Sequence, residues 1–244
     1  MSATSFVSET GVPVPTVTAV EMREVDRIAI EETGPALLQM MENAGANLAS
    51  LTIERLGPSW RKARVLVLAG RGGNGGGGLC AARHLANRGL DVSVCIADPE
   101  RLHPAAALQR RILAVAGGSE VGAAALDGFR TDLVVDALLG YSLIGAPRGH
   151  PAELIAWANG QTAPVLSLDL PSGIDATTGA APGAAIRANW TLTLALPKPG
   201  VASDLAGELF LADIGIPAPV LRRLAPGYQP PFDARSPIAL ARGP

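Results

Sequence analysis

The stretch VLVLAGRGGNGGGGLCAAR, from Val65 to Arg83, decides the fold of this chain. Five apolar residues, Val65 to Ala69, lead into nine residues of which seven are glycine, and a helix-like segment carrying Leu79 and Leu85 follows. A continuous apolar run bounded by glycines is typical of a strand covered on both faces, as in a parallel sheet. Glycine lets a ligand approach the backbone closely, and the N-terminus of the next helix offers unpaired N–H groups with a partial positive charge. The stretch therefore predicts a strand, a tight loop that holds an anionic or polar ligand, and a helix.

Outward from this stretch, strand and helix patterns alternate along the chain. Short apolar runs predict strands at residues 92–96, 132–137, 165–170, 192–196 and 209–212. Apolar residues at helical spacing predict helices at residues 18–33, 37–56, 104–116 and 151–158. Strands that alternate with helices imply right-handed crossovers and a mostly parallel sheet with helices on both faces. We therefore expect an α/β fold, a three-layer α/β/α sandwich of the Rossmann-like type.

Composition divides the chain into three segments. Residues 1–17 are expected to form a flexible leader, residues 18–224 a single domain, and residues 225–244, with five prolines, an irregular Pro-rich tail. Inside the domain, Gly45 lies in the second predicted helix, where glycine costs about 1 kcal/mol relative to alanine. We therefore expect that helix to pack closely against another backbone.

The overall charge and hydropathy exclude several classes of partner. The 244 residues suit one large α/β domain, and an apolar fraction of 48% is ample for its core. Lys and Arg total 20 against 22 Asp and Glu, so a net charge of −2 gives no broad attraction for nucleic acid or anionic lipid. No run of about 18 apolar residues and no secretion signal is found. We expect a soluble cytoplasmic protein with no nucleic-acid or membrane partner.

The spacing of the cysteines and histidines in the sequence does not indicate a metal centre. Cys80 and Cys95 fall in a predicted helix and a predicted strand, and neither has metal-ligand spacing or a disulfide-rich context. Buried thiols are expected. His84, His103 and His150 also lack metal-ligand spacing, and we expect them at the surface.

Three carboxylates follow the predicted strands. Asp98 comes after the second strand, Asp136 closes the third in VVDALLG, and Asp169 closes the fourth in LSLDLPSG. Ligands of open α/β sheets bind outside the carboxyl ends of the strands, and a carboxylate is costly to bury there unpaired. Asp98-Pro99-Glu100 is typical of a turn leading to a helix, whereas Asp136 and Asp169 precede glycine-bearing turns and are the better functional candidates.

The glycine spacing alone leaves a nicotinamide dehydrogenase as an alternative. Gly70, Gly72 and Gly75 satisfy G-x-G-x-x-G, and Asp98 lies some twenty residues beyond, as in dinucleotide-binding sites. So glycine-dense a stretch matches many spacings by chance. No Lys-Ser or Lys-Thr follows the glycines and no G-x-S-x-G is present, which excludes a Walker loop and a hydrolase elbow.

Four ordered motifs carry a more specific resemblance. AGRGGNGGGGLCAARHL, DLVVDALLGYSLIGAPRG, VLSLDLPSGIDATTG and LPKPGV, together with LLQMMENAG and ADIGIP, resemble the NAD(P)H-hydrate epimerase family over residues 18–217. The resemblance implies a Rossmann-like fold, a possible homodimer, and interconversion of the R and S epimers of hydrated NADH and NADPH. It also implies functional coupling to a separate dehydratase, because the dehydratase domain fused to some members is missing here.

Site residues follow from the same resemblance. Asn74, Asp136 and Ser172 correspond to ligands of a potassium ion, and Asp169 to a substrate-contacting carboxylate, to which we assign acid/base and electrostatic duties. The remaining substrate-binding positions belong to two loops: Gly73, Asn74, Gly75, Gly76 and Gly77, and Gly140, Tyr141, Ser142, Leu143, Ile144, Gly145 and Ala146.

Two positions depart from the family pattern. Gly73 and Gly77 stand where the family usually has an asparagine and an aspartate, so one amide and one carboxylate are missing from the pocket mouth. The departure motivates an alternative, in which the protein keeps the fold and binds nucleotide or regulates without turnover.

Overall fold

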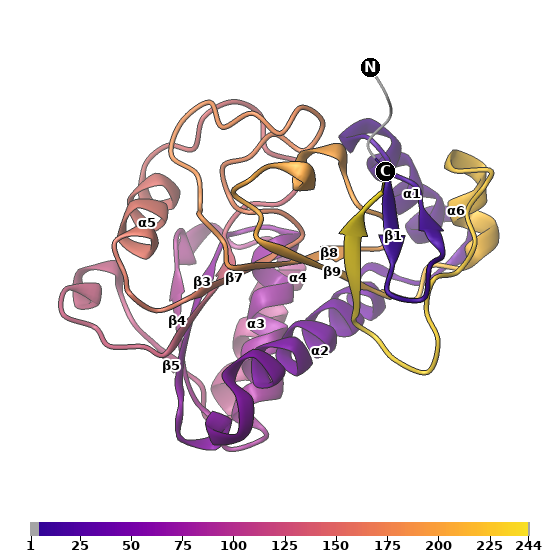
Figure 1. Cartoon of the computed structure of the whole chain (residues 1–244). Helices are drawn as coiled ribbons and strands as arrows, with labels where there is room; N and C mark the ends of the chain where they lie inside the picture. Colours follow the sequence, from indigo (N-terminus) through magenta and orange to yellow (C-terminus); the bar gives the residue numbers. More distant parts are fainter. Residues whose placement is uncertain (1–4, 244) are drawn as a thin grey trace.

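The computed structural model describes residues 5–243, and its strands form one ten-stranded sheet (Figure 1). The order across the sheet is β2-β1-β10-β9-β8-β7-β6-β3-β4-β5. The strands are β1 (Phe6–Ser8), β2 (Pro13–Val14), β3 (Arg64–Ala69), β4 (Asp91–Ile96), β5 (Ser119–Glu120), β6 (Leu133–Ala137), β7 (Val165–Leu168), β8 (Trp190–Leu194), β9 (Glu208–Ala212) and β10 (Ile238–Arg242). From β9 to β5 every neighbouring pair is parallel, which confirms the mostly parallel sheet.

Helices cover both faces of the sheet, so the three-layer α/β/α arrangement is confirmed. The helices are α1 (Ala19–Ile28), α2 (Leu37–Leu56), α3 (Gly73–Ala86), α4 (Pro104–Val115), α5 (His150–Asn159) and α6 (Ala218–Leu224). Helices α2, α3 and α4 pack side by side on one face, whereas α5 lies on the other (Figure 1). No helix of the described residues is both long and apolar enough to cross a membrane.

The apolar run of β3 divides its side chains between two cores. Val65 and Val67 belong to the larger cluster, which includes residues of α2, α3 and α4, and Leu66 and Leu68 belong to a smaller one with Leu154 of α5. Successive side chains of a strand point to opposite faces, so a strand covered on both faces must be apolar throughout. This is why the sequence at 65–69 lacks the alternation of a half-exposed strand.

The strand order places a topological switch beside the glycine stretch. From β3 the chain continues to β4 and β5 on one side of the sheet, and then returns to β6 and β7 on the other side of β3. The crossovers therefore leave β3 in opposite directions, and a crevice opens at the carboxyl ends of β3 and β6. Asp136 and the glycines after Ala69 lie at this edge.

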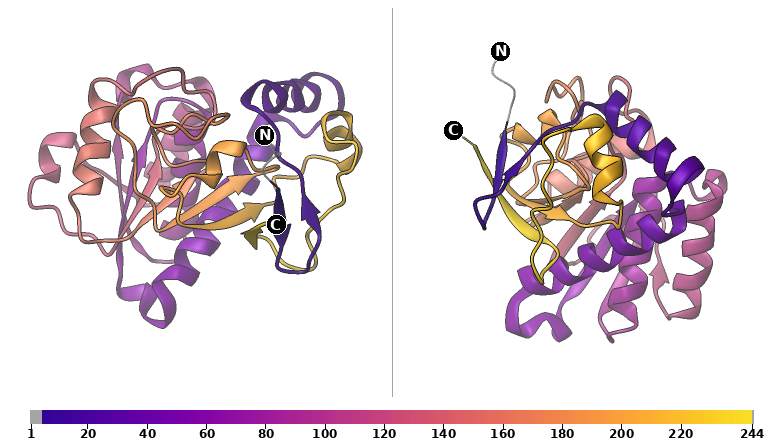
Figure 2. Two further views of the ribbon diagram at one scale, coloured as in Figure 1. Left: turned by 45° about the horizontal axis from the view of Figure 1, so that its top comes forward. Right: turned by 90° about the vertical axis from the view of Figure 1, so that its right-hand side faces the viewer.

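The expected leader and tail are part of the sheet, so both expectations were wrong for the described residues. β10 pairs antiparallel with β9, and β1 pairs antiparallel with β10 and β2 (Figure 2). Phe6, Val14 and Ile238 are almost fully buried. A bare β9 would expose unpaired backbone groups, and the added strands cover that edge. Residues 1–4 of the expected leader and residue 244 of the expected tail lie outside the described residues.

The glycine stretch is largely helix rather than loop. α3 begins at Gly73, so most of the predicted loop forms its first turns. A Cβ on Gly70 would lie 1.8 Å from the carbonyl oxygen of Leu138, and one on Gly75 would lie 1.8 Å from that of Gly70. The glycines are therefore required by backbone contacts within the protein. The close approach to another backbone expected at Gly45 is confirmed, since a Cβ there would lie 3.0 Å from the backbone nitrogen of Ala81 on α3.

These contacts predict unequal effects of alanine within one helix. Gly75→Ala should lower the free energy of unfolding by about 1–3 kcal/mol, because the new methyl group overlaps backbone atoms that cannot move aside. Gly73→Ala is the matched control, since a Cβ on Gly73 would have no heavy atom of another element within 4 Å. Its effect should stay within about 1 kcal/mol. Urea unfolding of the two variants measures the difference, and equal stabilities would contradict the packing argument.

Candidate active site

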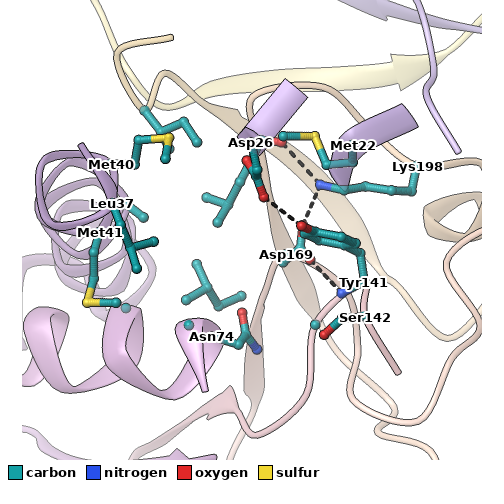
Figure 3. Close-up of a pocket in the computed structure, with 17 residues that line it drawn as sticks. Met22, Asp26, Leu37, Met40, Met41, Asn74, Tyr141, Ser142, Asp169 and Lys198 are labelled. Atoms are coloured by element: carbon teal, nitrogen blue, oxygen red, sulfur yellow. Dashed lines mark hydrogen bonds and ion pairs between the residues drawn. The ribbon is translucent and has the colours of Figure 1, made fainter. Parts of the chain in front are cut away.

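A cavity of about 310 Å³ lies between the carboxyl edge of the sheet and the helices α1, α2 and α3 (Figure 3). Its apolar wall comes mainly from α1, the first turns of α2 and the ends of β7 and β8: Met22, Leu37, Met40, Met41, Ala44, Leu168, Leu194 and Ile214. Its polar groups are Asp26, Asn74, Tyr141, Ser142, Asp169 and Lys198. An apolar cavity with a few convergent polar groups is the usual form of a small-molecule site.

Asp169 follows β7 and is 3% exposed. Its φ of 69° lies in the left-handed region, which Asp tolerates better than most residues. Its backbone N–H donates to the Leu192 carbonyl at 2.7 Å, and its Oδ2 accepts a hydrogen bond from the Tyr141 N–H at 2.9 Å. An uncommon backbone conformation thus holds the carboxylate at the cavity wall, which favours a functional role.

Lys198 supplies the positive charge opposite Asp169. Its Nζ lies 2.5 Å from Asp169 Oδ1 and donates to the Leu194 carbonyl at 3.1 Å, and the side chain is 1% exposed. No role was predicted for this lysine, although LPKPGV was among the motifs. The signal was available, because Lys198 is an isolated charge just beyond an apolar strand, as Asp136 and Asp169 are.

Asp26 links α1 to the wall of the first cavity that carries Asp169 and Lys198. Its Oδ2 accepts a hydrogen bond from the Tyr141 hydroxyl at 2.6 Å, and the Tyr141 ring centroid lies 5.7 Å from Lys198 Nζ (Figure 3). Burial raises the pKa of Asp26 and that of Tyr141 above their ordinary values. No sequence pattern pointed to Asp26, because its partner Tyr141 is distant in the chain.

A second cavity of about 750 Å³ adjoins the first, and the two share Gly73, Asn74, Gly140 and Ser142. Most of the predicted substrate positions divide between them. Gly77, Tyr141 and Asp169 line the first cavity, and the second is lined by Leu143, Ile144, Gly145 and Ala146. Gly75 and Gly76 line neither, because they pack against Gly70 and Met41. Asp98, the alternative ribose-binding residue, also lines the second cavity, and its carboxylate lies 3.8 Å from Arg101.

Asp136 and Ser172, two of the predicted potassium ligands, lie together and are fully buried. Ser172 donates to Asp136 through its hydroxyl at 2.6 Å and its backbone N–H at 2.8 Å. The carboxylate also accepts from the Ser167 hydroxyl at 2.8 Å and the Leu138 N–H at 3.2 Å. All four donors are neutral, and burial raises the pKa of Asp136.

The third predicted ligand, Asn74, lies near Gly140 and Asp169. A Cβ on Gly140 would lie 3.4 Å from Asn74 Oδ1 and 3.0 Å from Asp169 Oδ2. The Asn74 amide nitrogen is buried and has no hydrogen-bond partner among the described residues. The amide oxygen of Asn74, the carboxylate of Asp136 and the hydroxyl of Ser172 are oxygen ligands that suit a hard cation, and a cation would balance the buried charge of Asp136. The residues present therefore fit a potassium ion in chemistry.

The family model and the most similar known proteins point to the same family. A family model described as YjeF-related protein N-terminus matches residues 37–200. The chain is 50% identical over 233 residues to the NAD(P)H-hydrate epimerase of Dehalogenimonas lykanthroporepellens, with 95% of each chain covered. It is 37% identical to the NAD(P)H-hydrate epimerase of Rhodopirellula baltica, with 86% of this chain and 88% of that one covered. It is also 38% identical to a bifunctional NAD(P)H-hydrate repair enzyme of Moorella thermoacetica, of which it spans 40%.

The fold has a solved counterpart in the yeast protein ynu0. The two structures superpose with a TM-score of 0.80, covering 94% of this chain and 100% of the yeast chain at 23% sequence identity. At this identity the likeness concerns the fold, and the sequence relatives identify the family. The chain belongs to the YjeF-related family of NAD(P)H-hydrate epimerases, as its motifs predict.

Proposed function

We propose that this protein interconverts the R and S epimers of hydrated NADH and NADPH, and so acts in nicotinamide nucleotide repair. Its relatives in Dehalogenimonas and Rhodopirellula are named as such epimerases. The structural observation that carries the proposal is the buried pair of Asp169 and Lys198 in the wall of a largely apolar cavity. This arrangement offers charge and a proton-transfer group to an uncharged ring.

The chemistry of the substrate explains what such a site must supply. The hydrated nicotinamide carries a hydroxyl on the carbon next to the ring nitrogen. Departure of this hydroxyl is assisted by the nitrogen lone pair and leaves a planar, iminium-like cation. Water then adds to the other face and inverts the centre. The enzyme must transfer a proton to and from the hydroxyl and stabilise the transient positive charge.

Asp169 is suited to both tasks in this proposal. Its carboxyl group lies at the cavity wall beside Lys198. In its acid form it would protonate the hydroxyl, which leaves as water; the resulting carboxylate stabilises the cation and takes back a proton from the water that adds to the other face. Lys198 orients the carboxyl group through the contact of its Nζ with Asp169 Oδ1. Tyr141 fixes Asp169 through its backbone N–H, and its hydroxyl is in turn held by Asp26. We treat Lys198, Tyr141 and Asp26 as positioning residues.

The second cavity would take the remainder of the nucleotide. It adjoins the first through the start of α3, whose N-terminus favours negative charge. Arg71 and Arg148 also line it and add positive charge. The nicotinamide would then occupy the smaller, more apolar cavity beside Asp169, and the phosphates the larger one.

We further propose that a potassium ion is held by Asn74, Asp136 and Ser172. The ion would supply a positive charge that keeps Asp136 ionised and holds the start of α3 near the loop that follows β7. Asp136→Asn retains the shape of the side chain but removes its charge. The potassium concentration needed for half-maximal epimerisation should rise by more than the about 10- to 100-fold that loss of an outer partner costs.

Potassium titration of the epimerisation rate tests this prediction, with tetramethylammonium chloride keeping the ionic strength constant. Circular dichroism of the variant comes first, since Asp136 accepts four hydrogen bonds. A folded variant with the wild-type potassium response would exclude the shared site.

Gly73 and Gly77 raise the alternative of a binding protein without turnover. Nothing lies within 4 Å of a Cβ at Gly73, and a Cβ at Gly77 would meet only the Leu168 Cδ2 methyl at 2.8 Å. Both positions line the first cavity, with open space at Gly73, whereas a side chain at Gly77 would have to displace Leu168. The geometry around Asp169 does not depend on them.

Epimerisation by the purified protein distinguishes the two functions. Each epimer of hydrated NADPH is incubated with protein and potassium, and chromatography follows the approach to the equilibrium mixture after the spontaneous rate is subtracted. An enzyme accelerates both directions. Thermal stabilisation by the ligand without any acceleration would support the binding protein instead.

A second enzyme would act after this one in the cell. A separate dehydratase that consumes the S epimer would draw the equilibrium forward, so the two proteins would act in sequence in the cytoplasm. A homodimer, as the family resemblance implies, is checked by light scattering of the purified protein.

A further inference from the structure

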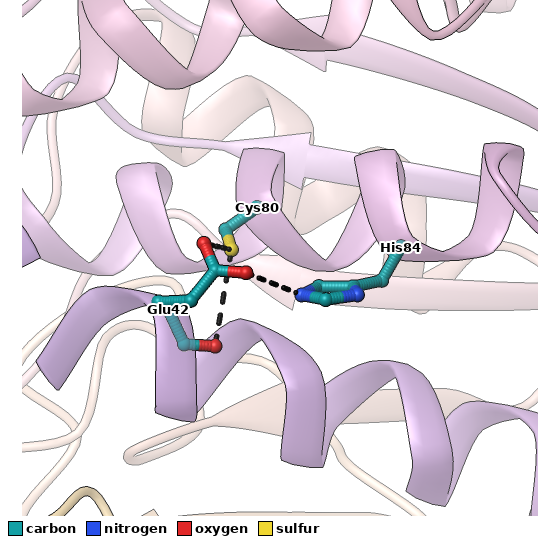
Figure 4. A group of neighbouring side chains, drawn as sticks. All are labelled: Glu42, Cys80 and His84. Atoms are coloured by element: carbon teal, nitrogen blue, oxygen red, sulfur yellow. Dashed lines mark hydrogen bonds and ion pairs between the residues drawn. The ribbon is translucent and has the colours of Figure 1, made fainter. Parts of the chain in front are cut away.

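Glu42, Cys80 and His84 form a cluster of metal-ligating side chains outside the cavities (Figure 4). Glu42 lies on α2, and Cys80 and His84 lie four residues apart on α3, on the face that packs against α2. One donor atom from each lies within 4.8 Å of the others. No metal-ligand spacing was visible in the sequence, because the i, i+4 pair lacks its third member until α2 supplies it.

The distances within the cluster are close to those of a tetrahedral metal site. Glu42 Oε1 lies 2.9 Å from His84 Nε2, and the other carboxylate oxygen, Oε2, lies 3.4 Å from Cys80 Sγ. Typical bonds of zinc to oxygen, nitrogen and sulfur imply separations of about 3.3 Å between O and N and about 3.5 Å between O and S. The three side chains therefore need only small adjustments to share one ion.

A cation already lies at the centre of the cluster. Arg83 Nη2 is 2.6 and 2.7 Å from the Glu42 oxygens, 3.3 Å from Cys80 Sγ and 3.4 Å from His84 Nε2. The cluster is thus arranged around positive charge. The cluster does not satisfy the whole guanidinium group, because Arg83 Nε is buried with no hydrogen-bond partner among the described residues. A metal ion would have to displace this guanidinium.

We propose that Glu42, Cys80 and His84 bind a borderline divalent metal ion of the zinc type, with water as the fourth ligand and Arg83 turned outward. The mixed sulfur, nitrogen and oxygen donors select such an ion over potassium or magnesium, which prefer oxygen. Cys80 binds as the thiolate, so one proton passes to solvent for each ion bound. Glu42 is 45% exposed at its side chain and provides the path of entry.

The site differs from the epimerisation centre in position and chemistry, and the inference does not rest on the proposed function. Since α2 and α3 also carry Met41 and Asn74 of the first cavity, a bound ion would fix the helices that frame it.

Cobalt(II) titration of tag-free protein tests the proposal directly. Binding to the wild type should produce thiolate-to-cobalt absorption in the near ultraviolet and the intense visible bands of a tetrahedral ion. Cys80→Ser should abolish the thiolate band, and His84→Gln should weaken affinity by more than the about 10- to 100-fold that loss of an outer partner costs. Arg83→Met should strengthen binding, because the competing cation is removed.

Cys95→Ser is the matched control, because Cys95 is the other buried thiol and lies on β4, outside the cluster. The cobalt spectrum of this variant should equal that of the wild type. A wild type without the thiolate band, or a band that survives in Cys80→Ser, would overturn the site. If Cys80→Ser does not fold, His84→Gln decides, and an unchanged affinity there would overturn it equally.

Discussion

Replacing Asp169 by asparagine is expected to slow epimerisation by about 10²- to 10⁴-fold, the usual range for general acid/base catalysis. This corresponds to about 2.7–5.5 kcal/mol in the activation barrier. Asparagine keeps the size of the side chain and tolerates the φ of 69°, so the backbone at the end of β7 is retained. It cannot exchange a proton in the same way or place a full negative charge beside an iminium-like ring. The loss should appear in kcat, with a much smaller change in KM.

The measurement requires subtraction of the spontaneous interconversion of the epimers. Thermal unfolding of Asp169→Asn is recorded alongside, because the variant leaves Lys198 buried without its carboxylate partner. A corrected rate within about threefold of the wild type, well under about 1.4 kcal/mol in the barrier, would remove Asp169 from the mechanism. The binding function without turnover would then become the better proposal.

Lys198→Met should reduce both stability and activity. Removing one partner of a buried ion pair leaves an uncompensated charge, which typically lowers the free energy of unfolding by about 3–5 kcal/mol. The side chain is 1% exposed and contacts both Asp169 and the Leu194 carbonyl, so solvent cannot take its place. The kcat of epimerisation should also fall, because Asp169 loses the group that orients it. Urea unfolding and the epimerisation assay measure the two effects.

Lys62 provides the matched control, since it is the other lysine of the chain and is exposed on the surface. Lys62→Met should change stability by less than about 0.5 kcal/mol. The double variant Asp169→Asn with Lys198→Met should be more stable than the sum of the two single losses implies, because no lone charge is left. Additive losses would show that Lys198 and Asp169 do not act as a pair.

The fold was predictable from the sequence where local pattern and tertiary position agree. The apolar run at 65–69 is a central strand with two covered faces, and the alternation of strands and helices gives the parallel sheet. The resemblance to the epimerase family is confirmed by the family model and the relatives. The position of Asp169 at the carboxyl edge of the sheet, where it lines the first cavity, was also predictable, because a charge that ends an apolar strand is visible without the fold.

The residues that sequence reasoning missed depend on contacts between distant segments. Lys198 becomes informative only when its Nζ is seen beside Asp169, and Asp26 only when α1 meets Tyr141. The glycines posed a different problem. Their density indicated a ligand loop, whereas Gly70 and Gly75 serve close backbone contacts and α3 starts inside the stretch.

Both chain ends were misjudged for a physical reason. Prolines and small residues in these segments are typical of irregular structure, yet the short run Ile238–Arg242 lies beyond the last internal proline and pairs with β9. Short strands of this kind need only a few residues and owe their order to the sheet beside them. Propensity within the segment therefore carries little information about them.

The pairing of β1 with β10 has a consequence for biosynthesis. Phe6 lies opposite Arg242, so β1 can pair only after β9 and the segment that follows it have been synthesised. While the ribosome is still making the centre of the protein, β1 and β2 have no sheet to join, and the Phe6 side chain remains exposed to solvent. The parallel core from β3 to β9 can assemble during translation, whereas β1 and β2 must wait until β10 has been synthesised. In that interval the N-terminal segment is the part of the nascent protein that a chaperone would find exposed.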